Sequence, residues 1–356
     1  MENRLKIFKQ KLKERELSAA IVTDELNIGY LCGFRFSDGY LLIDEECAYI
    51  VTDFRYFEEA SKHCAHGFEV VMPEDRIAFI KEFLNKGGHK ALGFEGNNMT
   101  VATYDRYREL LEVSFLPLGD VLTEMRAIKS DEEIQKIKKA QAITDEAFSH
   151  ILNVITPSIT ERDIALELSY FMKKHGAEGD GFEIIAVSGD ASALPHGKCR
   201  NKRISKGFLT MDFGCIYEGY CSDMTRTVCV GKADVEMKRL YQTVLRAQEE
   251  ALSVIKAGET ASFIDGIARG YIEKEGYKNA FGHGLGHGVG LYIHEIPSLS
   301  PRATGRRLVA GNVITVEPGI YLMGKYGCRI EDMGVVTAEG FDNFTHSTKE
   351  MIELFT

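Results

Sequence analysis

Four acidic residues in two separate stretches are the first candidates for chemistry in this sequence. Asp212 lies in "LTMDFG" and Glu317 in "VITVEPG", each directly after an apolar, β-prone run in which a core-facing side chain is expected. Asp223 and Glu331 follow them, each beyond a glycine-containing turn. An ionised carboxylate in an apolar setting is costly unless a cation compensates its charge. The pattern therefore favours four acids around bound cations over four separately solvated side chains.

Both pairs of acids are placed by predicted β-hairpins. The first, "GFLTMDFGCIYEGYCSDMTRTVCV", turns at the letters EG, so Asp212 and Asp223 lie on opposing strands, directly across or diagonally adjacent, with Cβ atoms about 5–8 Å apart. The second, "NVITVEPGIYLMGKYGCRIEDMGVV", turns near Gly324, and a three- or five-residue loop brings Glu317 opposite Glu331. Four carboxylates in one place repel one another, so they must take up protons or bind metal.

A glycine-rich stretch, "FGHGLGHGVGLYIHE", contains the imidazoles for such a site. An oxygen-rich cluster with one imidazole suits divalent Mn, Co, Fe or Zn. In an extended chain the glycines leave one face bare for a ligand or another strand, while His283 and His287 share the other face. A straight chain would carry His294 too far from His287 to serve the same site. We therefore expect a bend at Gly288 and Gly290, which lack a Cβ atom.

Two other interpretations of this stretch fail on its letters. A dinucleotide or phosphate loop requires G-x-G-x-x-G or G-x-x-x-x-G-K-[ST], and a zincin requires H-E-x-x-H, where this chain has H-E-I-P-S. One more histidine, His196 in "SALPHGK", precedes the first hairpin much as His294 precedes the second, and is a candidate for the same site. The remaining histidines are interpreted as structural: His63, His66, His89, His150, His175 and His346.

The elements that hold these residues belong to the second of two predicted domains. At 356 residues the chain exceeds the usual size of a single hydrophobic core. In the N-terminal part, short β-rich runs such as "AAIVTD" and "ALGFEG" alternate with helical patterns, as in an α/β domain with a sheet of mixed direction. Ser130 and Glu133 then form a capping box that opens a long amphipathic helix. We therefore divide the chain into residues 1–122 and 123–356.

The second domain shows an internal duplication. Helical segments at about 131–154 and 160–175 precede the first hairpin, and segments at about 234–256 and 262–275 precede the second. Two such units predict an α+β domain with pseudo-twofold symmetry, in which the two hairpins face each other across a shared cleft.

The composition argues against several classes of protein. A formal net charge of −10 and the lack of a Lys/Arg block argue against a nucleic-acid partner. The sequence has neither a run of about 18 apolar residues nor a signal-peptide pattern, so a cytoplasmic protein without membrane contact is expected. The eight cysteines are scattered without a C-x-x-C pair and are interpreted as buried thiols.

The second domain resembles the pita-bread metallopeptidases of peptidase family M24, which include methionine aminopeptidase, aminopeptidase P and prolidase. The resemblance is carried by "HGLGHGVGL", by "HEIP" and by five residues in a fixed order: Asp212, Asp223, His287, Glu317 and Glu331. Residues 1–120 resemble the creatinase/prolidase-type N-terminal domain of the proline-specific branch. The resemblance implies an α/β N-terminal domain followed by an α+β pita-bread catalytic domain.

The resemblance also implies the metal ligands and the nucleophile. Two divalent metal ions are expected per subunit, with Mn as first choice and Co, Fe or Zn as alternatives. Asp212 and Asp223 would bind one ion. Asp223 would be shared with a second ion held by His287, Glu317 and Glu331, and Glu331 would bridge as well. A hydroxide between the ions would be the nucleophile, because two cations lower the pKa of a bridging water.

Further roles follow from the same resemblance. Glu317 would also shuttle a proton to the leaving nitrogen, and His294 would stabilise the oxyanion. His196 and His283 match histidines that line the substrate cleft. Substrate binding is therefore expected from all three histidines, and catalysis from His196, His294 and Glu317. Arg329 matches an arginine that orients the ligand carboxylates.

The implied function is hydrolysis of the Xaa-Pro bond at the N-terminus of peptides with proline in second position, by a homodimeric Xaa-Pro aminopeptidase. Many prolidases carry an arginine four residues after the catalytic histidine, where this chain has Ser298; Arg302 is a candidate substitute. An Xaa-Pro dipeptidase (prolidase) is the alternative, followed by a creatinase-like hydrolase and a non-catalytic binding module. The loop Gly33–Gly39 is the candidate contact to a partner subunit, with an ordinary β-turn as alternative.

Overall fold

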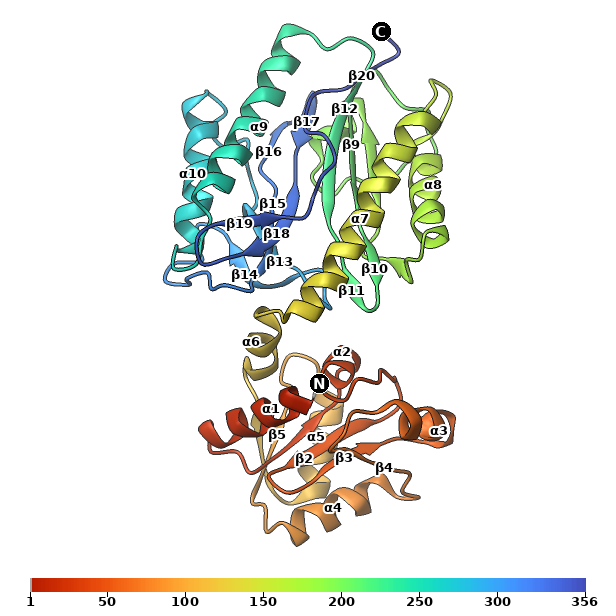
Figure 1. Cartoon of the computed structure of the whole chain (residues 1–356), viewed down its shortest axis with the longest axis vertical. Coiled ribbons are helices and arrows are strands. Elements are labelled where there is room, and N and C mark those ends of the chain that lie inside the picture. Colours follow the sequence, from red (N-terminus) through yellow and green to blue (C-terminus); the bar gives the residue numbers. More distant parts are fainter. Residues whose placement is uncertain (1) are drawn as a thin grey trace. The chain divides into compact units, whose positions relative to one another are not determined.

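The chain folds into two compact units. The computed structural model describes residues 2–356; the first unit ends at Met125 and the second begins at Arg126 (Figure 1). Helix α6 (Val121–Ala127) contains this division. Among the described residues, no helix combines the length and the apolar character needed to cross a membrane. The cysteines of the described chain are free thiols, and five of the eight are buried.

The first unit is built on a six-stranded sheet. Its strands are β1 (Ala19–Val22), β2 (Tyr40–Asp44), β3 (Ala48–Val51), β4 (Glu69–Val71), β5 (Ala91–Phe94) and β6 (Ser114–Pro117). Its helices are α1 (Glu2–Glu14), α2 (Glu25–Cys32), α3 (Phe54–His63), α4 (Arg76–Lys86) and α5 (Val101–Leu111). The strand order is β4-β3-β2-β1-β5-β6, with β2 antiparallel to both neighbours and the other pairs parallel. The predicted mixed direction is confirmed.

Four long helices of the second unit match the predicted segments. They are α7 (Asp131–Val154), α8 (Glu161–Lys174), α9 (Val235–Val254) and α10 (Ala261–Lys274), with a short 3₁₀ helix η1 (Gly189–Ala193) between α8 and α9. The predicted capping box opens α7: the Glu133 N–H donates to Ser130 Oγ at 3.3 Å, and the Ser130 N–H donates to Glu133 Oε2 at 2.8 Å. Side chains thus satisfy N–H groups that the first turn leaves without helical partners.

The strands of the second unit form two main sheets and two small ones. The strands are β7 (Gly179–Asp180), β8 (Ile185–Ser188), β9 (Gly207–Phe213), β10 (Cys215–Tyr217), β11 (Tyr220–Cys221), β12 (Met224–Val230), β13 (Gly286–Gly288), β14 (Glu295–Leu299), β15 (Val313–Val316), β16 (Gly319–Leu322), β17 (Tyr326–Arg329), β18 (Asp332–Val336), β19 (Phe341–Asn343) and β20 (Glu353–Leu354). The main sheets have the orders β20-β12-β9-β8 and β14-β13-β15-β18-β19. The small sheets are β11-β10-β7 and β16-β17.

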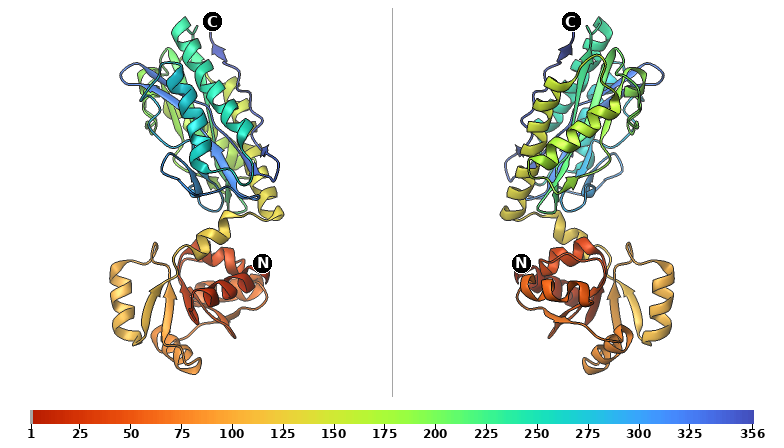
Figure 2. Two further views of the ribbon diagram at one scale, coloured as in Figure 1. Left: turned by 90° about the vertical axis from the view of Figure 1, so that its left-hand side faces the viewer. Right: turned by 90° about the vertical axis from the view of Figure 1, so that its right-hand side faces the viewer.

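The internal duplication is visible in how the helices pack. Helices α7 and α8 share one hydrophobic core with β8, β9 and β12, whereas α9 and α10 share another with β15, β16 and β17. Figure 1 shows the two helix pairs on opposite sides of the strands, and Figure 2 shows them running alongside the strands. Thr160 caps α8 and bridges to Arg203, while Thr260 caps α10 and bridges to Arg307. Equivalent caps in both halves support the predicted pseudo-twofold repeat.

Both predicted hairpins form, but neither is one continuous ladder. In the first, Tyr217 pairs with Tyr220 across the EG turn, whose two residues both have positive φ, and β9 pairs with β12 over seven residues. The two parts are separated at Gly214, where a Cβ atom would lie 1.9 Å from the Ser222 carbonyl oxygen. In the second, the β16–β17 pair closes with a three-residue loop centred on Gly324, whose φ is 73°.

The alternating glycines allow β13 to lie between two neighbouring strands. A Cβ atom on Gly286 would lie 2.1 Å from a carbonyl oxygen in β15, and one on Gly288 would lie 2.4 Å from a carbonyl oxygen in β14. The close approach of other strands is therefore confirmed. The bend predicted at Gly288 and Gly290 is confirmed for Gly290, since the chain turns over residues 290–294. Gly288 lies in β13 instead, and neither glycine has positive φ. At both positions a Cβ atom would come within 2.5 Å of an oxygen atom, so their missing side chains also allow close packing.

Gly286→Ala is expected to lower the free energy of unfolding by about 1–3 kcal/mol, because the added methyl group overlaps the Thr315 carbonyl oxygen. Gly282→Ala is the matched control, since no atom lies within 4 Å of its Cβ position. Urea unfolding followed by circular dichroism measures both variants. Equal unfolding midpoints for the two variants would contradict the close packing of β13.

Candidate metal centre

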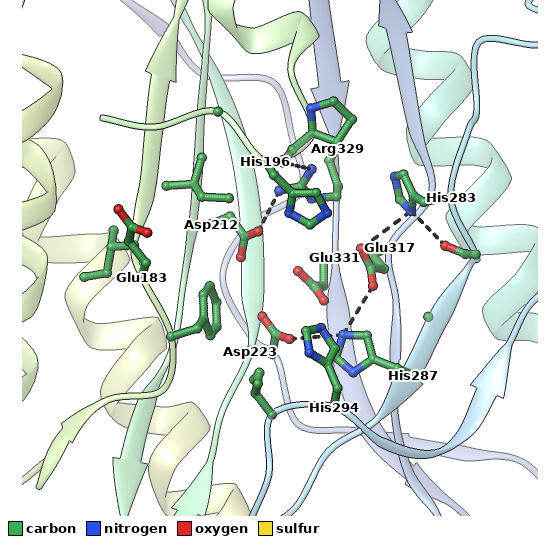
Figure 3. Close-up of a pocket in the computed structure, with 18 of the residues that line it drawn as sticks. Glu183, His196, Asp212, Asp223, His283, His287, His294, Glu317, Arg329 and Glu331 are labelled. Carbon is green, nitrogen blue, oxygen red and sulfur yellow. Dashed lines mark hydrogen bonds and ion pairs between the residues drawn. The ribbon is translucent and has the colours of Figure 1, made fainter. Parts of the chain in front are cut away.

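The two hairpins bring the four acids together in the second unit (Figure 3). In the first hairpin Asp212 lies opposite Thr225, so Asp223, two residues earlier, is its diagonal neighbour. In the second, the strand pairs on either side of Glu317 and Glu331 share one register, which places these two residues opposite each other. Both predicted arrangements of the acids are confirmed.

His287, on β13, directs one ring nitrogen at this cluster. Its Nε2 lies 3.5 Å from Asp223 Oδ2 and 3.4 Å from Glu317 Oε1. Its Nδ1 is 3.1 Å from the Gly288 carbonyl oxygen, which can only accept a hydrogen bond. Nδ1 therefore carries the proton, and Nε2 has a lone pair for a metal ion. Ligand atoms of His287, Asp223 and Glu331 lie within 4.8 Å of one another.

Burial changes the protonation of these groups. It raises the pKa of Asp223 and of Glu331 well above the usual range, and repulsion from neighbouring carboxylates adds to the effect. Burial also raises the pKa of Glu317 to about 8. It lowers the pKa of His287 to about 4, so that the imidazole is neutral near pH 7. Without a cation this environment favours the protonated forms of these carboxyl groups, whereas a divalent cation favours the ionised forms.

Arg329 compensates part of the negative charge. It is 4% exposed and donates from Nη2 to Asp212 Oδ2 at 2.6 Å and from Nε to Thr225 Oγ1 at 2.9 Å. Thr225 in turn donates to Glu331 Oε2 at 2.7 Å. The other oxygen of Asp212, Oδ1, is buried and has no hydrogen-bond partner within residues 2–356. Such an atom is costly unless an ion binds it.

The donor set fits divalent metal ions. Four carboxylates and one neutral imidazole are hard to borderline ligands of the kind that Mn, Co, Fe and Zn accept. Asp212 Oδ1, which has no hydrogen-bond partner within residues 2–356, and His287 Nε2, which has a lone pair and faces two carboxylates, are two atoms available to a metal ion.

A pocket of about 510 Å³ opens onto this cluster. Every residue assigned to the site from the sequence lines it: His196, Asp212, Asp223, His283, His287, His294, Glu317, Arg329 and Glu331. The histidines interpreted as structural do not line it. Ser298 lines the pocket and Arg302 does not. The sequence-based set is therefore brought together around one cavity.

The three further histidines of the pocket differ in their hydrogen bonds. His283 Nδ1 donates to the Gly284 carbonyl oxygen at 2.8 Å, and its Nε2 accepts from the Tyr321 hydroxyl at 2.8 Å. Burial lowers the pKa of His283 to about 4 and also lowers the pKa of His294. The His294 ring lies 4.3 Å from the His287 ring, centroid to centroid, which confirms that the chain bends between them. Within residues 2–356, neither His196 nor His294 forms a ring hydrogen bond.

Sequence reasoning missed two residues that support the site. Thr225 connects Arg329 to Glu331, and the Tyr321 hydroxyl accepts from Arg329 Nη1 at 2.8 Å while donating to His283. Burial raises the pKa of Tyr321 to about 12, so the hydroxyl keeps its proton. Thr225 was detectable as the residue opposite Asp212 in the hairpin. Tyr321 has no comparable signal in the sequence, because its contacts join different strands.

Two segments of the chain match known families. Residues 135–338 match metallopeptidase family M24, and residues 4–128 match the creatinase/prolidase N-terminal domain. The chain belongs to metallopeptidase family M24. The resemblance drawn from the sequence is thereby confirmed.

Relatives of this M24 peptidase cover nearly its whole length. It is 36% identical over 356 residues to an Xaa-Pro dipeptidase of Pyrococcus horikoshii, covering 99% of both chains. Among solved structures it is similar to an Xaa-Pro dipeptidase from Bacillus anthracis (TM-score 0.96, 40% identity, 99% of both chains). It is also similar to an X-Pro aminopeptidase from Thermotoga maritima (TM-score 0.90, 36% identity, 97% of this chain and 100% of that chain). The expected creatinase/prolidase-type N-terminal domain and pita-bread catalytic domain are confirmed.

A buried ionic network holds the turn that carries His294. The carboxylate of the next residue, Glu295, accepts from Arg126 Nε and Lys129 Nζ, both at 3.0 Å. It also accepts from the Tyr292 N–H at 3.3 Å, so the Glu295 side chain is hydrogen-bonded to the backbone of the same turn. The side chains of Lys129 and Glu295 are each 1% exposed. The M24 peptidase thus anchors His294 through the backbone of this turn.

Binding of Mn²⁺ to this M24 peptidase is expected to release protons, because the raised pKa values of Asp223, Glu317 and Glu331 favour the protonated forms in the metal-free protein and a metal ion binds the ionised forms. The affinity should rise by about tenfold per pH unit for each displaced proton while the pH is below the pKa of about 8 of Glu317. His287 contributes no proton, since its pKa of about 4 leaves it neutral in this range. Calorimetric titrations in buffers of different ionisation enthalpy measure the release, and pH-independent affinity would contradict it.

Glu295→Gln is expected to destabilise the second unit by about 3–5 kcal/mol, because the change leaves Arg126 and Lys129 buried without their anionic partner. Glu249→Gln is the matched control, since its ion pair with Arg246 is exposed and its loss should cost no more than about 1 kcal/mol. Chemical unfolding measures both variants. A loss of unfolding free energy in Glu295→Gln as small as that in Glu249→Gln would show that the network contributes little stability.

Proposed function

We propose that the protein is a metal-dependent exopeptidase that hydrolyses the Xaa-Pro bond at the N-terminus of peptides. The carrying observation is the convergence of four carboxylates and one imidazole from separate parts of the chain around one pocket. Relatives described as Xaa-Pro dipeptidases and as an X-Pro aminopeptidase support the proline specificity. An Xaa-Pro aminopeptidase was the first expectation, and the dipeptidase was the alternative.

We propose five ligands for two divalent ions: Asp212, Asp223, His287, Glu317 and Glu331. Bound ions would lower the pKa of water and polarise the scissile carbonyl group. The protein's part is to hold the ligands in place. Arg329 fixes one oxygen of Asp212 and leaves the other free, and Thr225 fixes one oxygen of Glu331. Each of these carboxylates therefore presents a defined face to the pocket.

We assign the proton-transfer role to Glu317. Its carboxyl group lies at the pocket wall, and burial raises its pKa to about 8. A group that titrates near neutral pH can both take a proton and give one up. In the metal-bound enzyme the cations would lower this pKa, so Glu317 would start the reaction as a carboxylate. It would then take the proton that the attacking water gives up and pass it to the leaving proline nitrogen.

The histidines take different parts in this proposal. Within residues 2–356 the ring nitrogens of His294 and His196 form no hydrogen bond, so each can donate one to the substrate at the pocket. We assign stabilisation of the developing oxyanion to His294, whose ring is in edge-to-face contact with the His287 ring. His283 keeps both nitrogens in hydrogen bonds within the protein and forms a fixed wall of the cleft.

The pocket also suits a proline ring. An Xaa-Pro bond is a tertiary amide without an N–H, so its recognition depends on shape and apolar contact. The apolar part of the pocket wall is formed by Phe182, Ile184, Ile185, Pro195 and Ile293. The substrate's free amine would be attracted to the acidic side of the same cavity.

Several finer features complete the proposal. We propose Mn as the native metal, a cytoplasmic homodimer, and a domain boundary after residue 122, with residues 123–356 as the catalytic domain. The donor set supports a metal of this type. The loop Gly33–Gly39 is our candidate for the contact with a partner subunit. Metal analysis and sedimentation of the purified protein test the first two of these features.

The Mn-loaded enzyme is expected to hydrolyse Ala-Pro or Ala-Pro-Ala, and Glu317→Gln should reduce kcat by about 10²–10⁴-fold, because it removes the group assigned to proton transfer. Chelation with removal of the metal should abolish turnover, and added Mn²⁺ should restore it. Glu249→Gln, at an exposed ion pair outside the pocket, is the control and should keep full activity. Undiminished turnover in metal-free buffer would contradict the proposed function.

A further inference from the structure

Lys198 is a positively charged residue of the pocket whose ammonium group has no partner within residues 2–356. Two residues with permanent positive charge line the pocket, Arg329 and Lys198. The guanidinium group of Arg329 is buried and already donates to Asp212 and Tyr321. Lys198 is exposed, and within residues 2–356 its ammonium group forms neither a hydrogen bond nor an ion pair. Lys198 is therefore the cation that remains available to a ligand.

The backbone that carries Lys198 is anchored on both sides of the residue. The preceding Gly197 is buried, and a Cβ atom there would lie 3.0 Å from a side-chain carbon of β8. The following Cys199 thiol lies 3.1 Å from a backbone N–H in β8 and 3.1 Å from the carbonyl oxygen of the residue before β8. The side chain is therefore free to reach into the pocket while its Cα position is fixed, which reduces the entropy lost on binding a ligand.

We propose that Lys198 binds the C-terminal carboxylate of Xaa-Pro dipeptides and that the protein therefore prefers dipeptides to longer peptides. The inference rests on the proposed function and names its substrate class. In a dipeptide the proline itself carries the carboxylate. Each further residue of an extended peptide moves that charge by about 3.3–3.6 Å, away from a cation at a fixed place.

The charges of the pocket explain why such a cation is needed. Five acidic side chains line it, the four clustered acids and Glu183, which Figure 3 shows apart from the cluster. An anionic group of a substrate is repelled by carboxylates and is held only where a positive group compensates it. Ser298 is neutral, and Arg302 does not line the pocket, so neither supplies this charge. The neutral Ser298 favoured an aminopeptidase over a dipeptidase in the sequence analysis. With Lys198 as the cation, the dipeptidase is favoured instead.

The test compares a dipeptide with its neutral analogue on the Mn-loaded enzyme. Lys198→Gln is expected to raise KM for Ala-Pro roughly three- to tenfold, the size of a partly exposed charged contact, with kcat little changed. KM for Ala-Pro-amide, which lacks the carboxylate, should stay the same. Lys198→Arg keeps the charge and should retain most of the affinity for Ala-Pro. Lys202→Gln, an exposed lysine outside the pocket, is the matched control.

Two further measurements make the outcomes decisive. Added salt should raise KM for Ala-Pro in the wild type more than in Lys198→Gln, because salt screens an exposed charge pair. The wild type should also have a higher kcat/KM for Ala-Pro than for Ala-Pro-Ala. An equal effect of Lys198→Gln on Ala-Pro and its amide, or no effect on either, would overturn this inference alone. If the wild type hydrolysed none of these substrates, the proposed function itself would be overturned, and this inference with it.

Discussion

The clustering of four buried or half-buried carboxyl groups beside one imidazole is the interaction on which the rest of the second unit depends. Burial raises the pKa of Asp223, Glu317 and Glu331, and repulsion from neighbouring carboxylates adds to each shift. The fold must therefore hold these groups against forces that would separate them. Two antiparallel hairpins do so, since each fixes its pair of acids through a ladder of backbone hydrogen bonds on rigid strands.

Buried arginines join the two halves of the repeat next to this cluster. Arg329 in the second hairpin bonds Asp212 in the first, and its N–H and carbonyl both bond the Thr227 hydroxyl. In the opposite direction, Arg226 in the first hairpin bonds Asp332 in the second at 2.8 Å. The side chains of Arg226, Asp332 and Arg329 are almost fully buried, and that of Asp212 is 14% exposed. Loss of either partner would leave an unpaired buried charge, so these pairs fix how the two halves meet and hence the spacing between the pairs of acids.

The sequence carries the local part of this architecture because hairpin register depends on few residues. Gly324 at the centre of a three-residue loop is enough to place Glu317 opposite Glu331, and the positive-φ turn at Glu218 and Gly219 fixes the first hairpin in the same way. Helix limits follow from caps such as Ser130. Strand β2, Tyr40–Asp44, gave no alternating pattern because all five of its residues are buried. Gly214 shows the other limit, since its close approach to the Ser222 carbonyl oxygen interrupts the ladder within one hairpin, and the residue pattern of the two strands does not indicate this interruption.

The hydrogen bonds of the pocket histidines can be distinguished only in the structure, not in the sequence. The residue types and spacing alone make His196, His283 and His294 candidates for one site, and only the resemblance to the family assigns them different roles. In the structure His283 has both nitrogens bound, to Gly284 and Tyr321, and burial lowers its pKa to about 4. It would have to break a buried hydrogen bond to contact a substrate, at a cost of about 1–3 kcal/mol.

His294 has no such cost. Its ring has no hydrogen bond within residues 2–356, its pKa is lowered by burial, and its position is set by contact with the His287 ring and by the Glu295 network behind it. A neutral imidazole held in this way can keep one N–H directed at the pocket without reorganisation, which is the property that stabilisation of a developing oxyanion requires. In the proposed mechanism, hydrogen bonds within the protein, rather than proximity to the acids, therefore distinguish His294 from His283.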